Sequence, residues 1–177
     1  MQKGMFQKCK EIISKPSSFF KSLDEKGVKA AFYYSAVLSL VSLILGLGYG
    51  FLTDSTYSTI WGYLVLYWPF SVALNFLIAL ILHLFVKLFR GKGPYSKTYQ
   101  LYIYASTPSF LLGWIPYVSF LGSVWMLVLL VIGTMHMHKL SRARTIWLYA
   151  VVLAFELILL LIGYWLTFLF LGSALAA

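Results

Sequence analysis

Charge is scarce in this chain, and acidic residues are the scarcest: the 177 residues include five Asp and Glu against 14 Lys and Arg. Only 11% of the residues are charged and 61% are hydrophobic, whereas soluble domains average about 25% and 45–50%. A soluble core of this length cannot bury so much apolar surface, so the composition excludes an ordinary soluble domain. The basic residues fall in short clusters between apolar stretches, which argues against nucleic acid as a partner.

Cysteine is nearly absent, and no catalytic motif is present. Cys9 is the single cysteine, so the chain forms no intramolecular disulfide and no multi-cysteine metal site. His136 and His138 are two residues apart and lie on different sides of a helix, and neither they nor His83 have a carboxylate or thiol at metal-ligand spacing. No nucleophile–base pattern or phosphate-binding loop occurs. We expect no enzyme, no metal site and no cofactor.

Long uncharged stretches dominate the sequence, and a bilayer core of about 30 Å needs roughly 20 apolar residues per helix. The stretch 98–138 is too long for one transmembrane helix and slightly too short for two of full length. Pro108, Gly113 and Pro116 lie in its middle, so we predict a tight hairpin of two spans with a kink at Pro108. A re-entrant hairpin fits the charges equally well. The predicted spans are Ala30–Leu52, Ile60–Val86, Thr98–Leu112, Pro116–His138 and Thr145 onward. The predicted fold is therefore an all-α integral membrane bundle of five transmembrane helices.

All the basic residues lie on one side of this arrangement. Seven lysines precede the first span, four basic residues flank the loop after the second, and three lie between the fourth and the fifth. None falls in the other two loops or after the last span. By the positive-inside rule, the N-terminus is inside and the C-terminus outside.

The sequence divides into a basic segment, residues 1–27, and a transmembrane domain, residues 28–177. Apolar residues recur at helical spacing among the first lysines, namely Met5, Phe6, Cys9, Ile12 and Ile13. This pattern predicts an amphipathic helix lying on the inner leaflet. A disordered basic tail is the alternative.

Two segments carry a family resemblance. One reads GKGPYSKTYQLYIYASTP from Gly91 to Pro108, and the other reads WMLVLLVIGTMHMHKLSRAR from Trp125 to Arg144. In the second segment His138, Ser141 and Arg144 keep an H-x-x-S-x-x-R spacing. Together these segments resemble the Yip family, membrane proteins named for interacting with Ypt/Rab GTPases, in its shorter prokaryotic-type branch. The resemblance covers about residues 15–155.

This resemblance implies five helices with the N-terminus inside and the C-terminus outside. For eukaryotic members it implies work in vesicle traffic through Rab-type GTPases and partner Yip proteins. The chain has neither their long acidic N-terminal domain nor their D-L-Y-G-P motif, so we do not carry GTPase binding over to it. The short N-terminus favours a prokaryotic plasma membrane, with an endomembrane as the location if the chain is eukaryotic.

Glu156 is the most unusual residue of the apolar stretches, because it lies 12 residues past Arg144, or roughly 18 Å along a helix. An acid at that depth is costly and marks a function or a partner. Asn75, Ser106 and Thr107 are expected at comparable depth, so we predict that they and Glu156 form one intramembrane polar cluster inside the bundle. The cluster either binds a proton or cation, or joins helices through a protonated Glu156.

Two further sets of residues are predicted to make contacts. Ser42, Gly46 and Gly50 repeat at four-residue spacing and, with Pro108, are predicted helix-packing positions. The inner face is expected to attract anionic headgroups or an acidic partner. Its candidate residues are Lys92, Tyr95, Lys97, His138, Ser141, Arg142 and Arg144.

Taken together, these patterns favour a non-enzymatic polytopic membrane protein of Yip type. We expect an adaptor or organiser that acts through helix packing and its basic inner face, among membrane lipids and as a homo- or hetero-oligomer with other membrane proteins. Two alternatives stay open. One is a small proton- or cation-coupled transporter or channel centred on Glu156, and the other is a lipid-handling protein that uses its N-terminal helix.

Overall fold

The computed structural model describes the backbone of residues 4–53 and 55–175, and the side chains of that range except 55–62, 64 and 170–175. Within this part of the chain every regular element is an α-helix, which confirms the predicted all-α fold. Four helices are long and apolar enough to cross a membrane. They are α3 (Lys29–Thr53), α4 (Ser55–Leu88), α7 (Ser119–Met137) and α8 (Arg142–Leu175). Among the described side chains, the candidate spans of α4 and α8 are Val65–Leu88 and Arg142–Leu169.

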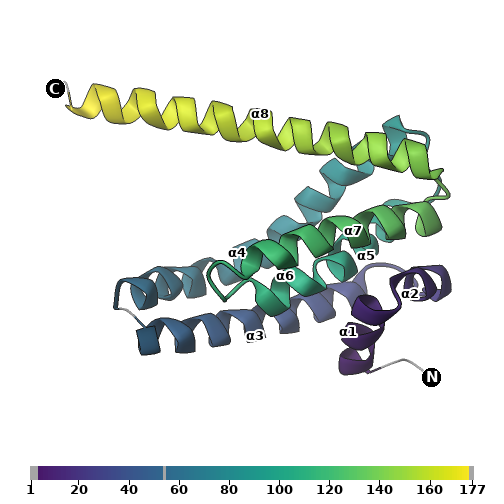
Figure 1. Cartoon of the computed structure of the whole chain (residues 1–177), viewed down its shortest axis with the longest axis horizontal. Helices are drawn as coiled ribbons and strands as arrows, with labels where there is room; N and C mark the ends of the chain where they lie inside the picture. Colours follow the sequence, from purple (N-terminus) through teal and green to yellow (C-terminus); the bar gives the residue numbers. More distant parts are fainter. Residues whose placement is uncertain (1–3, 54, 176–177) are drawn as a thin grey trace.

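The predicted third span is a broken helix that packs against α7. Its two parts are α5 (Tyr95–Ala105) and α6 (Thr107–Leu112), separated by Ser106. Both pack on α7, while α3 packs along α4 and both of these contact α5. Figure 1 shows these helices running side by side as one bundle. The expected hairpin is therefore present, although its first arm is too short and too polar to count among the four long apolar helices.

Pro108 explains where the third segment breaks. Proline has no backbone N–H, so Pro108 cannot donate to the carbonyl of Tyr104 as a helix would require. The side chain of Thr107 donates to that carbonyl instead, at 2.7 Å. Pro108 then occupies the first turn of α6, where a missing N–H costs nothing. The bend thus lies at Ser106, two residues before the proline expected to cause it.

The turn between α6 and α7 differs from the predicted boundary. The predicted fourth span begins at Pro116, whereas α7 begins at Ser119. Tyr117 has a positive φ of 65° and a side chain that is 97% exposed, so residues before Ser119 belong to the turn. At the start of α7, a side chain on Gly122 would come within 2.9 Å of the Pro108 carbonyl oxygen. The absent side chain allows the two arms to approach this closely.

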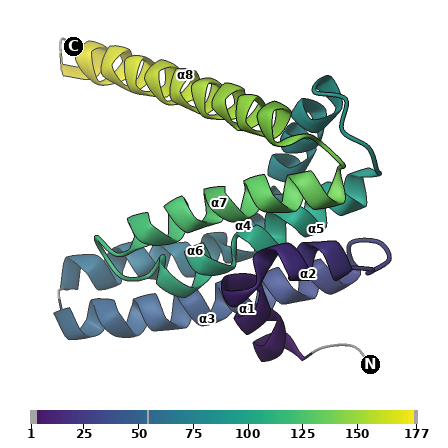
Figure 2. The same ribbon diagram turned by 45° about the vertical axis from the view of Figure 1, so that its right-hand side comes forward.

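The basic N-terminal segment folds back onto the bundle. It forms two short helices, α1 (Met5–Ser14) and α2 (Pro16–Ser22), with Pro16 at the start of the second. Ile12, Phe19 and Phe20 are buried, and α2 packs on α7. Phe6 stays 85% exposed. Of the apolar face predicted to lie on the leaflet, Ile12 is buried and Cys9 half-buried, whereas Met5, Phe6 and Ile13 are exposed. Figure 2 shows α2 beside α7.

The last helix leaves the bundle. Leu148 and Tyr149, near the start of α8, are buried, but nearly every described side chain from Ala150 to Leu169 is exposed. Figures 1 and 2 both show α8 diverging from α7 toward its C-terminal end. In a membrane these apolar side chains face lipid or another protein.

Candidate functional site

One end of the molecule, here called the basic end, carries every described Lys and Arg. It consists of α1, α2, the 89–94 loop and the 138–141 loop, with the adjoining helix ends. The side chains of Lys92, Lys97, Arg142 and Arg144 are exposed there. Tyr95 is half-buried, and its hydroxyl donates to the Phe76 carbonyl at 2.8 Å. The exposed cations form a surface that is open to headgroups or to a partner.

His138 is the exception among the predicted inner-face residues, because it is fully buried. It holds the 89–94 loop against the end of α7. The backbone N–H of Lys92 donates to the His138 carbonyl at 2.9 Å, and His138 Nδ1 lies 2.7 Å from the Lys92 carbonyl oxygen. Ser141 lies just before α8, and its hydroxyl accepts from the Arg144 N–H at 3.5 Å. These two positions of the H-x-x-S-x-x-R pattern therefore support the loop and the start of α8.

The hydrogen-bond geometry fixes the protonation of His138. A carbonyl oxygen only accepts, so Nδ1 of His138 carries a proton and donates to Lys92. Nε2 then accepts from the Thr98 hydroxyl at 3.1 Å, and the oxygen of that hydroxyl accepts from His83 Nδ1 at 2.6 Å. The result is a directed chain from α4 through α5 to the end of α7. Each side chain supplies the hydrogen-bond partner that the next one needs, so the chain joins α4, α5 and the end of α7 at the basic end.

Two glycines make the 89–94 loop possible. A side chain on Gly91 would lie 2.5 Å from Val86 Cγ1 and 2.9 Å from the Val86 carbonyl oxygen, and the N–H of Gly91 donates to that same oxygen at 2.7 Å. Gly93 adopts a φ of +105°, which residues with a Cβ rarely reach. The Gly-Lys-Gly sequence is thus a structural requirement of this loop.

Acid is expected to weaken this junction. Desolvation by burial lowers the pKa of His138 from its ordinary 6.5 to about 4, with Lys87 and Lys97 also opposing protonation. The unfolded chain therefore binds a proton between pH 6.5 and 4 that the folded chain does not, and stability falls as the pH falls through that window. The loss reaches about 2 kcal/mol at pH 5. Thermal unfolding at pH 7.5 and pH 5 should show it, with a smaller pH dependence in His138→Gln.

A second polar network attaches the N-terminal segment to α5. Lys8 Nζ forms an ion pair with the Glu25 carboxylate, whose other oxygen accepts from the Tyr104 hydroxyl. Gln100, one turn before Tyr104, donates to the carbonyls of Glu25 and Gly27. The side chains of Lys8 and Glu25 are 14% and 20% exposed. We call Lys8, Glu25, Gln100 and Tyr104 the N-terminal clasp.

Beside the clasp, Thr107 takes part in a separate hydrogen-bond chain. Its hydroxyl lies 2.8 Å from the Tyr34 hydroxyl, which in turn lies 3.2 Å from Cys9 Sγ. The clasp and this chain were not foreseen from the sequence. The available signals were an acid, Glu25, among lysines, and the four-residue spacing of Gln100 and Tyr104 on one face of a helix.

The four residues of the predicted intramembrane cluster lie in different surroundings. Ser106 donates to the Tyr102 carbonyl at 2.8 Å, and Tyr102 and Glu156 line one cavity. Thr107 instead belongs to the Tyr34 chain. Asn75 is half-buried on α4 and is not among the lining residues of the Glu156 cavity. Glu156 itself is exposed; it faces a crevice beside α8 and not a closed bundle interior.

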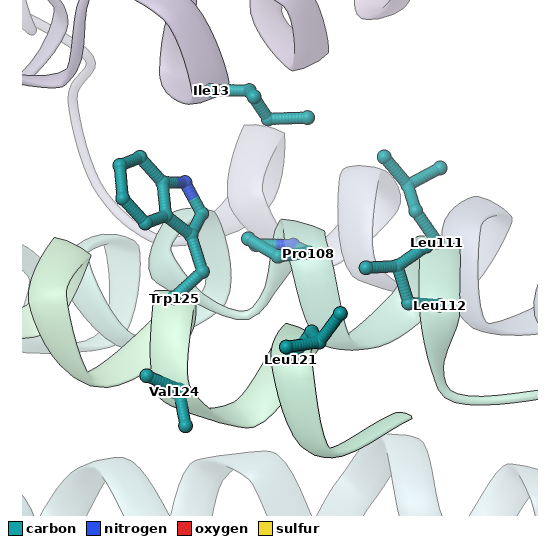
Figure 3. Close-up of a pocket in the computed structure, with 7 residues that line it drawn as sticks. All are labelled: Ile13, Pro108, Leu111, Leu112, Leu121, Val124 and Trp125. Atoms are coloured by element: carbon teal, nitrogen blue, oxygen red, sulfur yellow. The ribbon is translucent and has the colours of Figure 1, made fainter. Parts of the chain in front are cut away.

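The predicted helix-packing residues lie in two separate parts of the bundle, three of them on α3 and Pro108 at the start of α6. Gly46 and Gly50 are buried on α3, which packs along α4, and Ser42 is half-buried. Pro108 is buried and lines an apolar cavity of about 450 Å³ between α1, α6 and α7. Figure 3 shows Pro108 below Ile13 of α1, with Trp125 of α7 beside them.

Comparison with known proteins supplies the family. The Yip1 domain matches residues 10–175, which includes both segments of the sequence resemblance and nearly all of the helices described above. Searches of curated proteins and of solved structures found no match. The match confirms the Yip resemblance and identifies a multi-pass integral membrane protein. The chain belongs to the Yip1 domain family.

Proposed function

We propose that this protein is a five-span, non-enzymatic membrane organiser whose basic end faces the cytoplasm and holds lipids and partner proteins. The observation that carries the proposal is the segregation of charge: the exposed side chains of Lys92, Lys97, Arg142 and Arg144 all lie at one end of a long apolar bundle. Cations on that side are favoured by the positive-inside rule and by anionic headgroups.

The proposal assigns the third crossing to α5 and α6. These helices have 11 and 6 residues with Ser106 between them, a length of roughly 27 Å at 1.5 Å per residue. That length approaches the thickness of the hydrocarbon core, about 30 Å. The polar groups in this segment are supported by neighbouring helices, as the bond from Thr98 to His138 illustrates. A broken helix is tolerated in a membrane where other helices satisfy its backbone.

The adaptor role is supported by the two surfaces that the fold leaves open. The basic end presents cations to the cytoplasmic leaflet, and α8 presents an apolar surface within the membrane from Ala150 to Leu169. In the N-terminal segment, Ile12, Phe19 and Phe20 are buried against protein while Met5, Phe6 and Ile13 are exposed. The buried residues support a bracing role for that segment, and the exposed ones leave part of its apolar face to lipid.

Partner contacts should be captured by site-specific photo-crosslinking in native membranes. A photoreactive residue at Arg144 or Leu160 is expected to yield defined protein adducts, because these positions lie on the two open surfaces. Tyr117, which is 97% exposed at the opposite end, is the matched control position. Adducts that contain only lipid at both test positions would contradict the adaptor role.

The basic end should also select anionic lipids. Replacing Lys92, Lys97, Arg142 and Arg144 together with glutamine is expected to reduce the preference for phosphatidylglycerol over phosphatidylcholine, because headgroup attraction scales with the number of nearby cations. Native mass spectrometry of lipid adducts measures this preference. A control that exchanges the lysines for arginines and the arginines for lysines keeps the charge and should keep the selectivity. Equal selectivity in the neutralised variant would count against the basic end as a lipid contact.

A further inference from the structure

A second cavity lies deep in the predicted membrane region, between α8 and the helices from which it diverges. Its volume is about 560 Å³, and residues of α4, α5, α7 and α8 line it. Small-molecule sites usually measure about 300–1,000 Å³, so the cavity has the size of a small organic ligand. Most of its lining is apolar, including Ile78, Leu127 and Leu159.

Glu156 is the single charged residue among those that line the cavity. In the described part of the chain its carboxylate has no ion pair and no hydrogen bond, and every described Lys and Arg lies at the basic end. Glu156 is 14 residues into the helix that begins at Arg142, or roughly 21 Å from that end. No described basic side chain is therefore placed to neutralise it.

Aromatic rings accompany the carboxylate. Phe85 of α4 and Phe155 of α8 both line the cavity, with ring centroids 5.5 Å apart. The phenol of Tyr102 lines it from α5. The face of an aromatic ring attracts a cation within about 6 Å. A carboxylate and aromatic rings in an apolar cavity thus favour a ligand that is both positively charged and apolar.

We propose that this cavity binds a lipophilic organic cation, with the positive centre beside Glu156 and the apolar body among the side chains of α4 and α7. Inorganic cations prefer several oxygen ligands. Besides its one carboxylate the lining offers hydroxyls, and those of Ser123 and Tyr149 are already bonded to Ser119 and Thr134. A bilayer lipid keeps its headgroup at the surface, so its acyl chains reach this depth but bring no positive charge to Glu156. A second copy of the chain brings no described Lys or Arg to the middle of the membrane. The site is independent of the proposed adaptor function.

Two ions of the same shape test the proposal. Tetraphenylphosphonium and tetraphenylborate differ in the sign of their charge, and their binding to the protein in lipid nanodiscs can be measured by equilibrium dialysis against protein-free nanodiscs. We expect saturable binding of the phosphonium ion and at least tenfold weaker binding in Glu156→Gln. Asp24→Asn removes an exposed acid outside the cavity and should leave the phosphonium affinity unchanged.

A second variant keeps the test valid if Glu156→Gln does not fold. Ser123→Trp places a large side chain at the lining of the cavity from the exposed face of α7 and retains the carboxylate; it should also weaken phosphonium binding at least tenfold. Equal affinity for both ions would show an unspecific apolar cavity and overturn the proposal. Absence of phosphonium binding to the wild type would overturn it as well. That result would indicate that Glu156 contacts a helix of a partner protein instead.

Discussion

Replacing Glu25 with alanine is expected to release the N-terminal segment from the bundle. The change leaves Lys8 without its carboxylate partner and Tyr104 without its acceptor, because both bind the Glu25 side chain. Breaking a fully buried ion pair costs about 3–5 kcal/mol. Because the two charged side chains are 14% and 20% exposed, water compensates part of this loss, and we expect about 2–3 kcal/mol.

Cys9 reports this release directly. Its Sγ lies 3.2 Å from the Tyr34 hydroxyl in a half-buried position, and the chain has no other cysteine. Maleimide labelling of Cys9 in nanodiscs should therefore become several-fold faster in Glu25→Ala. Asp24→Ala removes the neighbouring exposed acid and should label at the wild-type rate. Adding Lys8→Met to Glu25→Ala should restore part of the stability, because no unpaired charge then remains. An unchanged labelling rate in Glu25→Ala would show that the clasp does not hold the segment.

Replacing Gly91 with alanine is expected to lower the free energy of unfolding by about 1–3 kcal/mol, the usual cost of overpacking. The new methyl group would lie 2.5 Å from Val86 Cγ1 and 2.9 Å from the Val86 carbonyl oxygen, so the loop or the end of α4 must shift. That shift also disturbs the hydrogen bonds between Lys92 and His138. The apparent melting temperature in detergent measures the effect.

Gly48 provides the matched control for this change. A side chain there meets nothing within 4 Å, and alanine is favoured over glycine within a helix by about 0.8–1 kcal/mol. Gly48→Ala should therefore leave the melting temperature unchanged or raise it. A similar decrease in both variants would mean that loss of glycine, and not crowding against Val86, causes the effect.

Hydropathy and charge located the four long apolar helices because both follow from the cost of placing groups in lipid. The predicted first span, Ala30–Leu52, differs by one residue at each end from α3. The hairpin and its break near Pro108 also followed from local chemistry, since proline removes a backbone donor. The exact position of the bend, Ser106, depends on the hydrogen bond from the Thr107 side chain to the Tyr104 carbonyl. A hydropathy pattern carries no information about that bond.

The remaining features depend on tertiary contacts that periodicity does not encode. An amphipathic pattern shows that Ile12 of α1 must be covered, but lipid and protein cover it equally well, so the packing of α1 on the bundle was not predictable. The buried position of His138 follows from its bonds to Lys92 and Thr98, which are 46 and 40 residues away. The depth of Glu156 in an apolar stretch marks it as unusual in the sequence. The divergence of α8 opens the cavity beside Glu156, and the uniformly apolar sequence of α8 does not predict that divergence.

The central claim is that α5 and α6 complete a crossing, so that the turn before α7 lies outside the cell and the basic end inside. Tyr117 in that turn is 97% exposed, and its replacement by cysteine in a Cys9→Ser chain tests the claim with a membrane-impermeant maleimide on intact cells. We predict that Tyr117→Cys is labelled without permeabilisation and that Lys139→Cys at the basic end is not. Labelling of Tyr117→Cys only after permeabilisation would contradict the five-span arrangement.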